Sequence, residues 1–259
     1  MAGGFMISSA DETNGGHNAA YNDSHRLFMQ TMLSHRVLTE EQAEVLYTKI
    51  CHLVQCERSE FAEFISDINA QINDIDLSLR RSRDERDGSP LVGLVNTKED
   101  EVAQIATKYT ASEIAYFRQM LELIVMADDE KNAVGSMAAL RLGQSMKPPM
   151  SQKDTQTLID RLVEDGWICL TPDGSSYTVD TRGILELQNY LREQYGDVIQ
   201  ECAVCMGVIT MGERCELQSC NVRIHRHCAD TYFRGGQMSC PTCETGWSRA
   251  NTYGLGLPL

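Results

Sequence analysis

The sequence lacks any long run of apolar residues. A membrane-spanning helix needs about 20 consecutive apolar residues, and the most apolar stretch here, residues 121–127, is interrupted by Glu122. The start of the chain also lacks the basic region and following apolar segment that mark a secretory signal. We therefore expect an intracellular protein that does not cross a membrane.

Basic residues are scarce as well. Lysine and arginine together number 23 against 37 aspartates and glutamates, a formal net charge of −14. Residues 201–259 hold five arginines and five acids, so the whole negative charge lies in residues 1–200. Binding to phosphates depends on basic side chains that displace counterions. The acidic body therefore disfavours direct DNA binding by the isolated chain and suits a basic protein partner.

Cysteine is nearly absent before residue 202, and seven of the ten cysteines lie between Cys202 and Cys243. Clustered cysteines of fixed spacing in a reducing compartment indicate metal ligands rather than disulfides. Together with one histidine they form four pairs, with gaps of two, nine, four, four, two, eleven and two residues between successive members. The predicted ligands are Cys202, Cys205, Cys215, Cys220, His225, Cys228, Cys240 and Cys243.

The spacing predicts two zinc ions in a cross-braced module. In that arrangement Cys202, Cys205, His225 and Cys228 hold one ion, and Cys215, Cys220, Cys240 and Cys243 hold the other. His227 is the alternative to His225, but the two-residue gap before Cys228 favours His225. Each site has four protein ligands and no open position, so the zinc is structural and we assign no catalytic residue.

The ligand order, with histidine fifth, is shared by PHD fingers and RING variants. Two residues before the seventh ligand stands Met238, where methyl-lysine-reading PHD fingers have an aromatic residue, so no aromatic cage is expected. Val204 and Pro241 resemble the RING residues that touch a ubiquitin-conjugating enzyme, and Phe233 is a further candidate for that contact. For all three the alternative is packing between zinc loops. Glu244 departs from the basic residue that strong RING ligases often carry there.

Residues 24–109 predict a first winged-helix domain. Thr39 with Gln42 forms a capping box at a helix start. Apolar residues repeat with a helical period across residues 61–79, and a short strand is expected at 91–95. The intervening arginines and acids are expected to form a solvated charge cluster.

The same order of elements repeats in residues 110–197. Thr110 with Glu113 is another capping box, and Ser151 begins a later helix. Residues 167–179 then read as a β-hairpin around a Pro-Asp-Gly turn. The predicted fold is therefore mainly α with small β wings: tandem winged-helix domains followed by a cross-braced two-zinc RING-like module. The predicted divisions are a disordered tail at 1–23, winged helices at 24–109 and 110–197, the zinc module at 198–246 and a tail at 247–259.

Across residues 24–243 the chain resembles one known family, the RING-bearing first non-SMC element subunit of the Smc-five/six chromosome maintenance complex. The most specific matches are Cys-x-x-Cys at 202–205, the segments 220–225 and 240–243, and the helix 183–192 before the zinc module. The resemblance implies a RING-type ubiquitin ligase activated by a MAGE-type winged-helix partner, alongside the other Smc-five/six subunits and a ubiquitin-conjugating enzyme. It also implies a nuclear role in DNA damage repair and recombination.

Two other functions compete with this interpretation. A non-enzymatic assembly subunit could use the zinc module only for docking, and Glu244 favours that alternative. DNA binding through the second winged helix would place residues 151–165 on the phosphates. That helix carries Lys153 and Arg161 against four acids, so we expect only weak, salt-sensitive binding.

Overall fold

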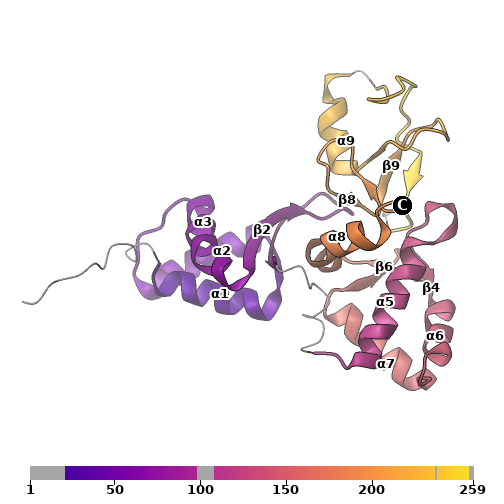
Figure 1. Cartoon of the computed structure of the whole chain (residues 1–259). Helices are drawn as coiled ribbons and strands as arrows, with labels where there is room; N and C mark the ends of the chain where they lie inside the picture. The colour runs from indigo at the N-terminus through magenta and orange to yellow at the C-terminus, as the bar shows by residue number, and fades with distance from the viewer. Residues whose placement is uncertain (1–20, 98–107, 237, 257–259) are drawn as a thin grey trace, which may run out of the picture.

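The computed structural model describes residues 21–97, 108–236 and 238–256. It shows tandem winged helices followed by a RING-like module, as the sequence predicted. In Figure 1 the first winged helix lies at the left, the second at the lower right, and the zinc module above the second. Within the described ranges, no helix has the length and apolarity to cross a bilayer.

The first winged helix packs three helices against an antiparallel sheet of order β1-β3-β2. Its elements are α1 (Asp23–His35), β1 (Val37–Thr39), α2 (Glu40–Val54), α3 (Phe61–Ile72), η1 (Asn73–Ile75), β2 (Leu77–Arg83) and β3 (Pro90–Asn96). Thr39 and Gln42 form the predicted capping box of α2. Aromatic rings fill the core, with Tyr47 stacked on Phe64 at a centroid distance of 4.0 Å.

Helix α3 is shorter than the helix that the apolar periodicity of residues 61–79 predicted. It ends at Ile72, and after η1 the left-handed Asp76 (φ 57°) turns the chain into β2. Leu79, expected on the helix, is buried in β2 instead. The Asn69 side chain bonds to the backbone N–H and C=O of Leu79 at 2.7 and 2.9 Å, which fixes β2 against α3. This side-chain anchor has no signature in the hydrophobic pattern.

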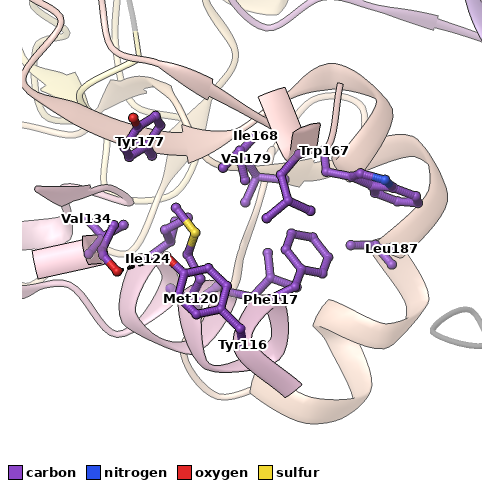
Figure 2. Close-up of a cluster of buried hydrophobic side chains, with 14 of the residues drawn as sticks. Tyr116, Phe117, Met120, Ile124, Val134, Trp167, Ile168, Tyr177, Val179 and Leu187 are labelled. Atoms are coloured by element: carbon purple, nitrogen blue, oxygen red, sulfur yellow. Dashed lines mark hydrogen bonds between the residues drawn. The ribbon is translucent and has the colours of Figure 1, made fainter. Parts of the chain in front are cut away.

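The second winged helix follows the predicted order closely. Its elements are α5 (Ala111–Val125), η2 (Asp128–Glu130), β4 (Val134–Gly135), α6 (Ser136–Ser145), α7 (Gln152–Glu164), β5 (Ile168–Leu170), β6 (Ser176–Val179) and α8 (Thr181–Tyr195). Gly166 ends α7 with a positive φ of 76°, and the cap of α8 is Asp180. The strands form a sheet of order β4-β6-β5. Figure 2 shows Phe117 of α5 facing Trp167, with a ring-centroid distance of 5.9 Å.

The zinc module is built from very short strands. Its elements are β7 (Gln200–Glu201), β8 (Val208–Ile209), β9 (Gly212–Arg214), β10 (Arg223–Ile224), α9 (Arg226–Tyr232), η3 (Phe233–Gly235) and β11 (Thr252–Tyr253). Strand β9 is central, with β10 and β11 antiparallel on either side. With strands of two or three residues, the backbone ladder alone cannot hold this module together.

The segment expected to be a C-terminal tail is packed as far as it is described. Trp247 is buried against Phe233 at a centroid distance of 5.4 Å, and its indole N–H donates to Glu213 at 2.8 Å. Tyr253 lies in β11 beside β9. The zinc module therefore extends beyond residue 246, because an aromatic cluster behind the last ligand closes its core. At the other end Asn22 caps α1, and residues 1–20 of the expected tail lie outside the described residues.

The turn between β2 and β3 reaches from the first winged helix to the start of α8 (Figure 1). Asp84 accepts a hydrogen bond from the Thr181 hydroxyl at 3.0 Å, and Arg86 lies 3.0 Å from the Asp180 carboxylate. Burial raises the pKa of Asp84, but the bonds from Arg86 and Thr181 more than offset this and hold the pKa below its usual range. The charged turn is thus an interdomain contact through Asp84 and Arg86, and the expected solvated cluster is found only in part, because Arg83 and Asp87 are exposed while Asp84 and Glu85 are buried.

Replacing Phe117 by alanine should reduce the free energy of unfolding by about 3–5 kcal/mol, because the truncation leaves a cavity against Trp167. Leu123→Ala is the control on the same helix, since Leu123 is 41% exposed and should cost about 0.5 kcal/mol. Urea unfolding followed by circular dichroism measures both values. Equal losses from the two variants would contradict the core assignment.

Candidate metal centre

The first cluster joins the first and third predicted pairs. The sulfurs of Cys202, Cys205 and Cys228 and a ring nitrogen of His225 all lie within 4.8 Å of one another. His225 Nδ1 is 3.3 Å from Cys205 Sγ and 3.9 Å from Cys228 Sγ. The knuckle 202–205 is fixed to the sheet because the backbone of Cys202 forms a β-bridge with Arg223 of β10. Helix α9 begins directly after His225 and carries Cys228.

The second cluster joins the second and fourth pairs. It contains Cys215, Cys220, Cys240 and Cys243, whose sulfurs also lie within 4.8 Å of one another. The Sγ–Sγ distances are 3.5 Å for Cys215 and Cys243 and 3.8 Å for Cys220 and Cys240. The structure thus brings the eight predicted side chains together in the cross-braced sets of four that the spacing predicted.

The distances suit zinc. Sulfurs bound about 2.3 Å from a tetrahedral ion lie about 3.8 Å from one another, close to the sulfur–sulfur distances in the second cluster. In the first cluster the distances from His225 Nδ1 to two sulfurs, 3.3 and 3.9 Å, are of the same size. Three thiolates with an imidazole and four thiolates are both common donor sets for structural zinc. The two clusters are therefore compatible with two zinc ions in a RING-like module. When bound, the metal would supply cross-links between loops.

His225 is oriented from outside the cluster. Its Nε2 lies 2.8 Å from Glu85 Oε1 and 3.2 Å from the Val208 carbonyl, so Nδ1 is the nitrogen that faces the sulfurs. Burial lowers the pKa of His225, but hydrogen bonds with Cys202, Cys205 and Glu85 outweigh burial and raise the pKa to about 12. A metal ion would have to displace a proton from this ring, so metal binding should release protons.

His227, the alternative ligand, is outside both clusters. Its ring stacks on that of His225 at a centroid distance of 5.1 Å, and it packs against Gly88 of the β2–β3 turn. A Cβ at Gly88 would come within 2.7 Å of His227 Cβ, so the turn lies directly against α9.

The predicted conjugating-enzyme contacts differ in exposure. Val204 is 39% exposed in the first knuckle, and Pro241 is exposed in the last knuckle. Phe233 is only 8% exposed and lies between Tyr232 and Trp247, with centroids at 5.1 and 5.4 Å. The structure therefore places Phe233 in the packed interior of the module, beneath rather than on its surface.

Sequence reasoning missed the residues that dock the module on the winged helices. Glu85 accepts from the Thr210 N–H at 3.0 Å and from the Thr210 hydroxyl at 2.6 Å. From the second winged helix, Glu130 pairs with the buried Arg223 and with Arg214, the latter at 2.7 Å. These partners are far apart in the chain, so no local pattern indicates the contacts.

Two clusters of metal-binding side chains, in a cross-braced module that follows tandem winged helices, define a RING-like zinc protein. Comparison with known proteins agrees: residues 202–243 match the family described as "RING-like domain". Residues 25–187 match the family described as "Nse1 non-SMC component of SMC5-6 complex". The chain belongs to this Nse1 family.

Individual relatives cover most of the chain. It is 30% identical over 230 residues to "Non-structural maintenance of chromosomes element 1 homolog" of Homo sapiens, covering 87% of this chain and 84% of that protein. The Schizosaccharomyces pombe protein "Non-structural maintenance of chromosomes element 1" is 23% identical over 235 residues, with 90% and 95% covered. A chain of a solved "Nse1-Nse3-Nse4 complex" matches with a TM-score of 0.78 at 28% identity, covering 88% of this chain and 97% of that one.

Removing metal with a chelator should unfold the zinc module selectively, because its short strands and loops have little apolar core of their own. Hydrogen exchange should accelerate across residues 202–243, while α5 and α7 in the second winged helix keep their protection. Exchange measured by mass spectrometry before and after chelation checks this. Retained protection in 202–243 would show that metal is not what holds the module together.

Proposed function

We propose that this chain is the RING-type ubiquitin ligase subunit of an SMC5-6 complex, acting in DNA repair and recombination in the nucleus. Membership of the Nse1 family and the RING-like module support the proposal. The observation that carries it is the exposed knuckle pair of the module, Val204 and Pro241, on a scaffold of two closed metal clusters.

The eight clustered residues would hold two structural zinc ions. Cys202, Cys205, His225 and Cys228 would ligate the first. The second would be held by Cys215, Cys220, Cys240 and Cys243. Four ligands leave no open position for a reacting water, so the sites support a positioning role and no hydrolytic one. This agrees with how RING ligases work, since they perform no covalent chemistry themselves.

In the proposed reaction, the conjugating enzyme docks on Val204 and Pro241. The module holds the conjugating enzyme so that its thioester is accessible to a lysine nucleophile, which lowers the barrier by orientation. Phe233 would contribute from beneath by fixing the loop between α9 and the last knuckle, since its ring is packed on Trp247. Glu244 is exposed where a basic residue strengthens other ligases, which fits an activity that depends on a partner.

The partner would be a MAGE-type winged-helix subunit together with the other SMC5-6 subunits. The similar solved structure, an Nse1-Nse3-Nse4 complex, supports an assembly of that kind. Leu123 on α5 is 41% exposed, and Met126, the residue that follows the helix, is 55% exposed, so these apolar side chains offer a surface outside the chain's own core. Helix α7 offers little positive charge to DNA, because Arg161 forms an ion pair with Glu113 at 2.6 Å.

Val204→Arg should abolish ubiquitin transfer while the chain still binds two metal ions, because it changes an exposed contact and no ligand. Leu217→Arg is the matched control: Leu217 is 45% exposed in a different zinc loop and should retain transfer. Chain formation in vitro and metal content by mass spectrometry measure the two properties. Loss of metal in the Val204 variant would instead assign this residue to the module's packing.

A transfer assay across a panel of conjugating enzymes, with and without a co-purified MAGE-type partner, separates the ligase from the assembly subunit. Cys240→Ala, which removes one predicted ligand, is the negative control. Ubiquitin chains that need both the partner and intact ligands would support a partner-activated ligase. Absence of chains from metal-loaded, partner-bound protein would favour the alternative, a non-enzymatic subunit that uses the module for docking.

A further inference from the structure

The β2–β3 turn of the first winged helix lies against the first metal cluster. Figure 1 shows the β2 hairpin extending from its own domain toward β8 and α8. Glu85 stands in this turn and is only 8% exposed, although it is an acid in a strongly charged segment. Its hydrogen-bonding partners among the described residues, Thr210 and His225, belong to the zinc module, 125 and 140 residues further along the chain.

The two carboxylate oxygens of Glu85 are both engaged. Oε1 lies 2.8 Å from His225 Nε2 and accepts from the Thr210 N–H at 3.0 Å. Oε2 accepts from the Thr210 hydroxyl at 2.6 Å. The turn is held close to the module by a second contact, because Gly88 packs so tightly on His227 that no Cβ fits between them.

The chemistry of these contacts determines which nitrogen of the His225 ring donates a hydrogen bond to Glu85. An ionised carboxylate only accepts hydrogen bonds, and so does the Val208 carbonyl 3.2 Å from the same nitrogen, so Nε2 must carry the proton. Nδ1 is then the ring nitrogen that faces the sulfurs of Cys205 and Cys228, and it would bind metal once it has given up its own proton. Such carboxylate–histidine pairs orient metal ligands, and their loss typically lowers metal affinity about 10–100-fold.

We propose that Glu85 is a positioning residue for the first metal site, and that this bond makes the docking of the first winged helix depend on metal occupancy. The inference rests on the proposed role of His225 as a zinc ligand. Because coupling of this kind is reciprocal, a docked turn strengthens metal binding and bound metal strengthens docking by the same factor. Among the described residues, the hydrogen bonds of Glu85 end on Thr210 and on His225 of the first cluster, and none joins it to the four cysteines of the second.

Cadmium-113 NMR of the full-length chain tests the proposal, because a site of three thiolates and one imidazole resonates apart from a site of four thiolates. Glu85→Ala should weaken metal binding at the first site about 10–100-fold in competition with a chelator, and leave the second site unchanged. Glu85→Gln should restore much of the affinity, because its amide oxygen still accepts from Nε2–H. Asp87→Ala is the matched control, an exposed acid in the same turn.

Two further measurements separate positioning from a merely structural role. In nitrogen-15 spectra of the histidine rings, Glu85→Ala should shift the Nε2 signal of His225, because only the longer 3.2 Å contact with the Val208 carbonyl remains, and Glu85→Gln should shift it less. Gly88→Val, which pushes the turn off α9 without touching Glu85, should weaken the first site alone. In the opposite direction, removing metal from the unchanged protein should speed hydrogen exchange in residues 84–89.

The outcomes are distinguishable. A wild-type chain that binds two cadmium ions with two resonances, together with an unaltered first site in Glu85→Ala, overturns the positioning role and leaves the zinc assignment intact. A wild-type chain without two bound ions overturns the zinc assignment and this inference with it. Equal weakening of both sites in Glu85→Ala also overturns the inference, because it would indicate general destabilisation of the module.

Discussion

Ligation of metal is the constraint on which the C-terminal quarter of this protein depends. The strands there are two or three residues long, and five of the twelve buried residues in the module's own apolar cluster are cysteines. Burial of so few large side chains offsets little of the chain entropy lost on folding. Metal cross-links between loops close that gap, and the exposed knuckles Val204 and Pro241 are positioned only as far as those links hold.

The winged helices hold this module through carboxylates, one from each domain. Glu85 of the first reaches His225, and Glu130 of the second reaches Arg223, which is 2% exposed and also donates to the carbonyls of Cys220 and Val222 at 3.1 and 3.0 Å. Each acid thus touches the stretch that leads from the second ligand pair into the third. Removing either carboxylate would leave a buried donor without its partner, which costs more than a surface ion pair contributes. These carboxylates join the zinc module to both winged helices through polar contacts, and Val208 of β8 also packs into the apolar cluster of the second winged helix beside Leu187 and Leu191.

The local features of the fold could be predicted from sequence, and the distant ones could not. Capping boxes at Thr39 and Thr110 and the ligand spacing are encoded within a few residues, so they identify helix starts and metal clusters directly. The end of α3 was missed because Leu79 falls on the helical period of the apolar residues before it, although it is buried in strand β2. Glu85 was missed for a different reason: an acid among arginines looks solvated until its partner 140 residues away is known. The aromatic closure by Trp247 likewise follows from packing and leaves no motif.

The path of the last strand bears on how the chain is made. The eighth cluster member is Cys243, but β11 joins β9 only at Thr252–Tyr253. Beyond it, Gly254 and Leu255 donate backbone hydrogen bonds to the carbonyls of Glu130 and Lys131 in the second winged helix, at 3.2 and 2.9 Å. During synthesis the winged helices leave the ribosome first and can fold as units. The nascent module therefore has all its metal-binding side chains before it has strand β11 or the backbone hydrogen bonds to the second winged helix. Metal binding can thus precede the final docking and guide it.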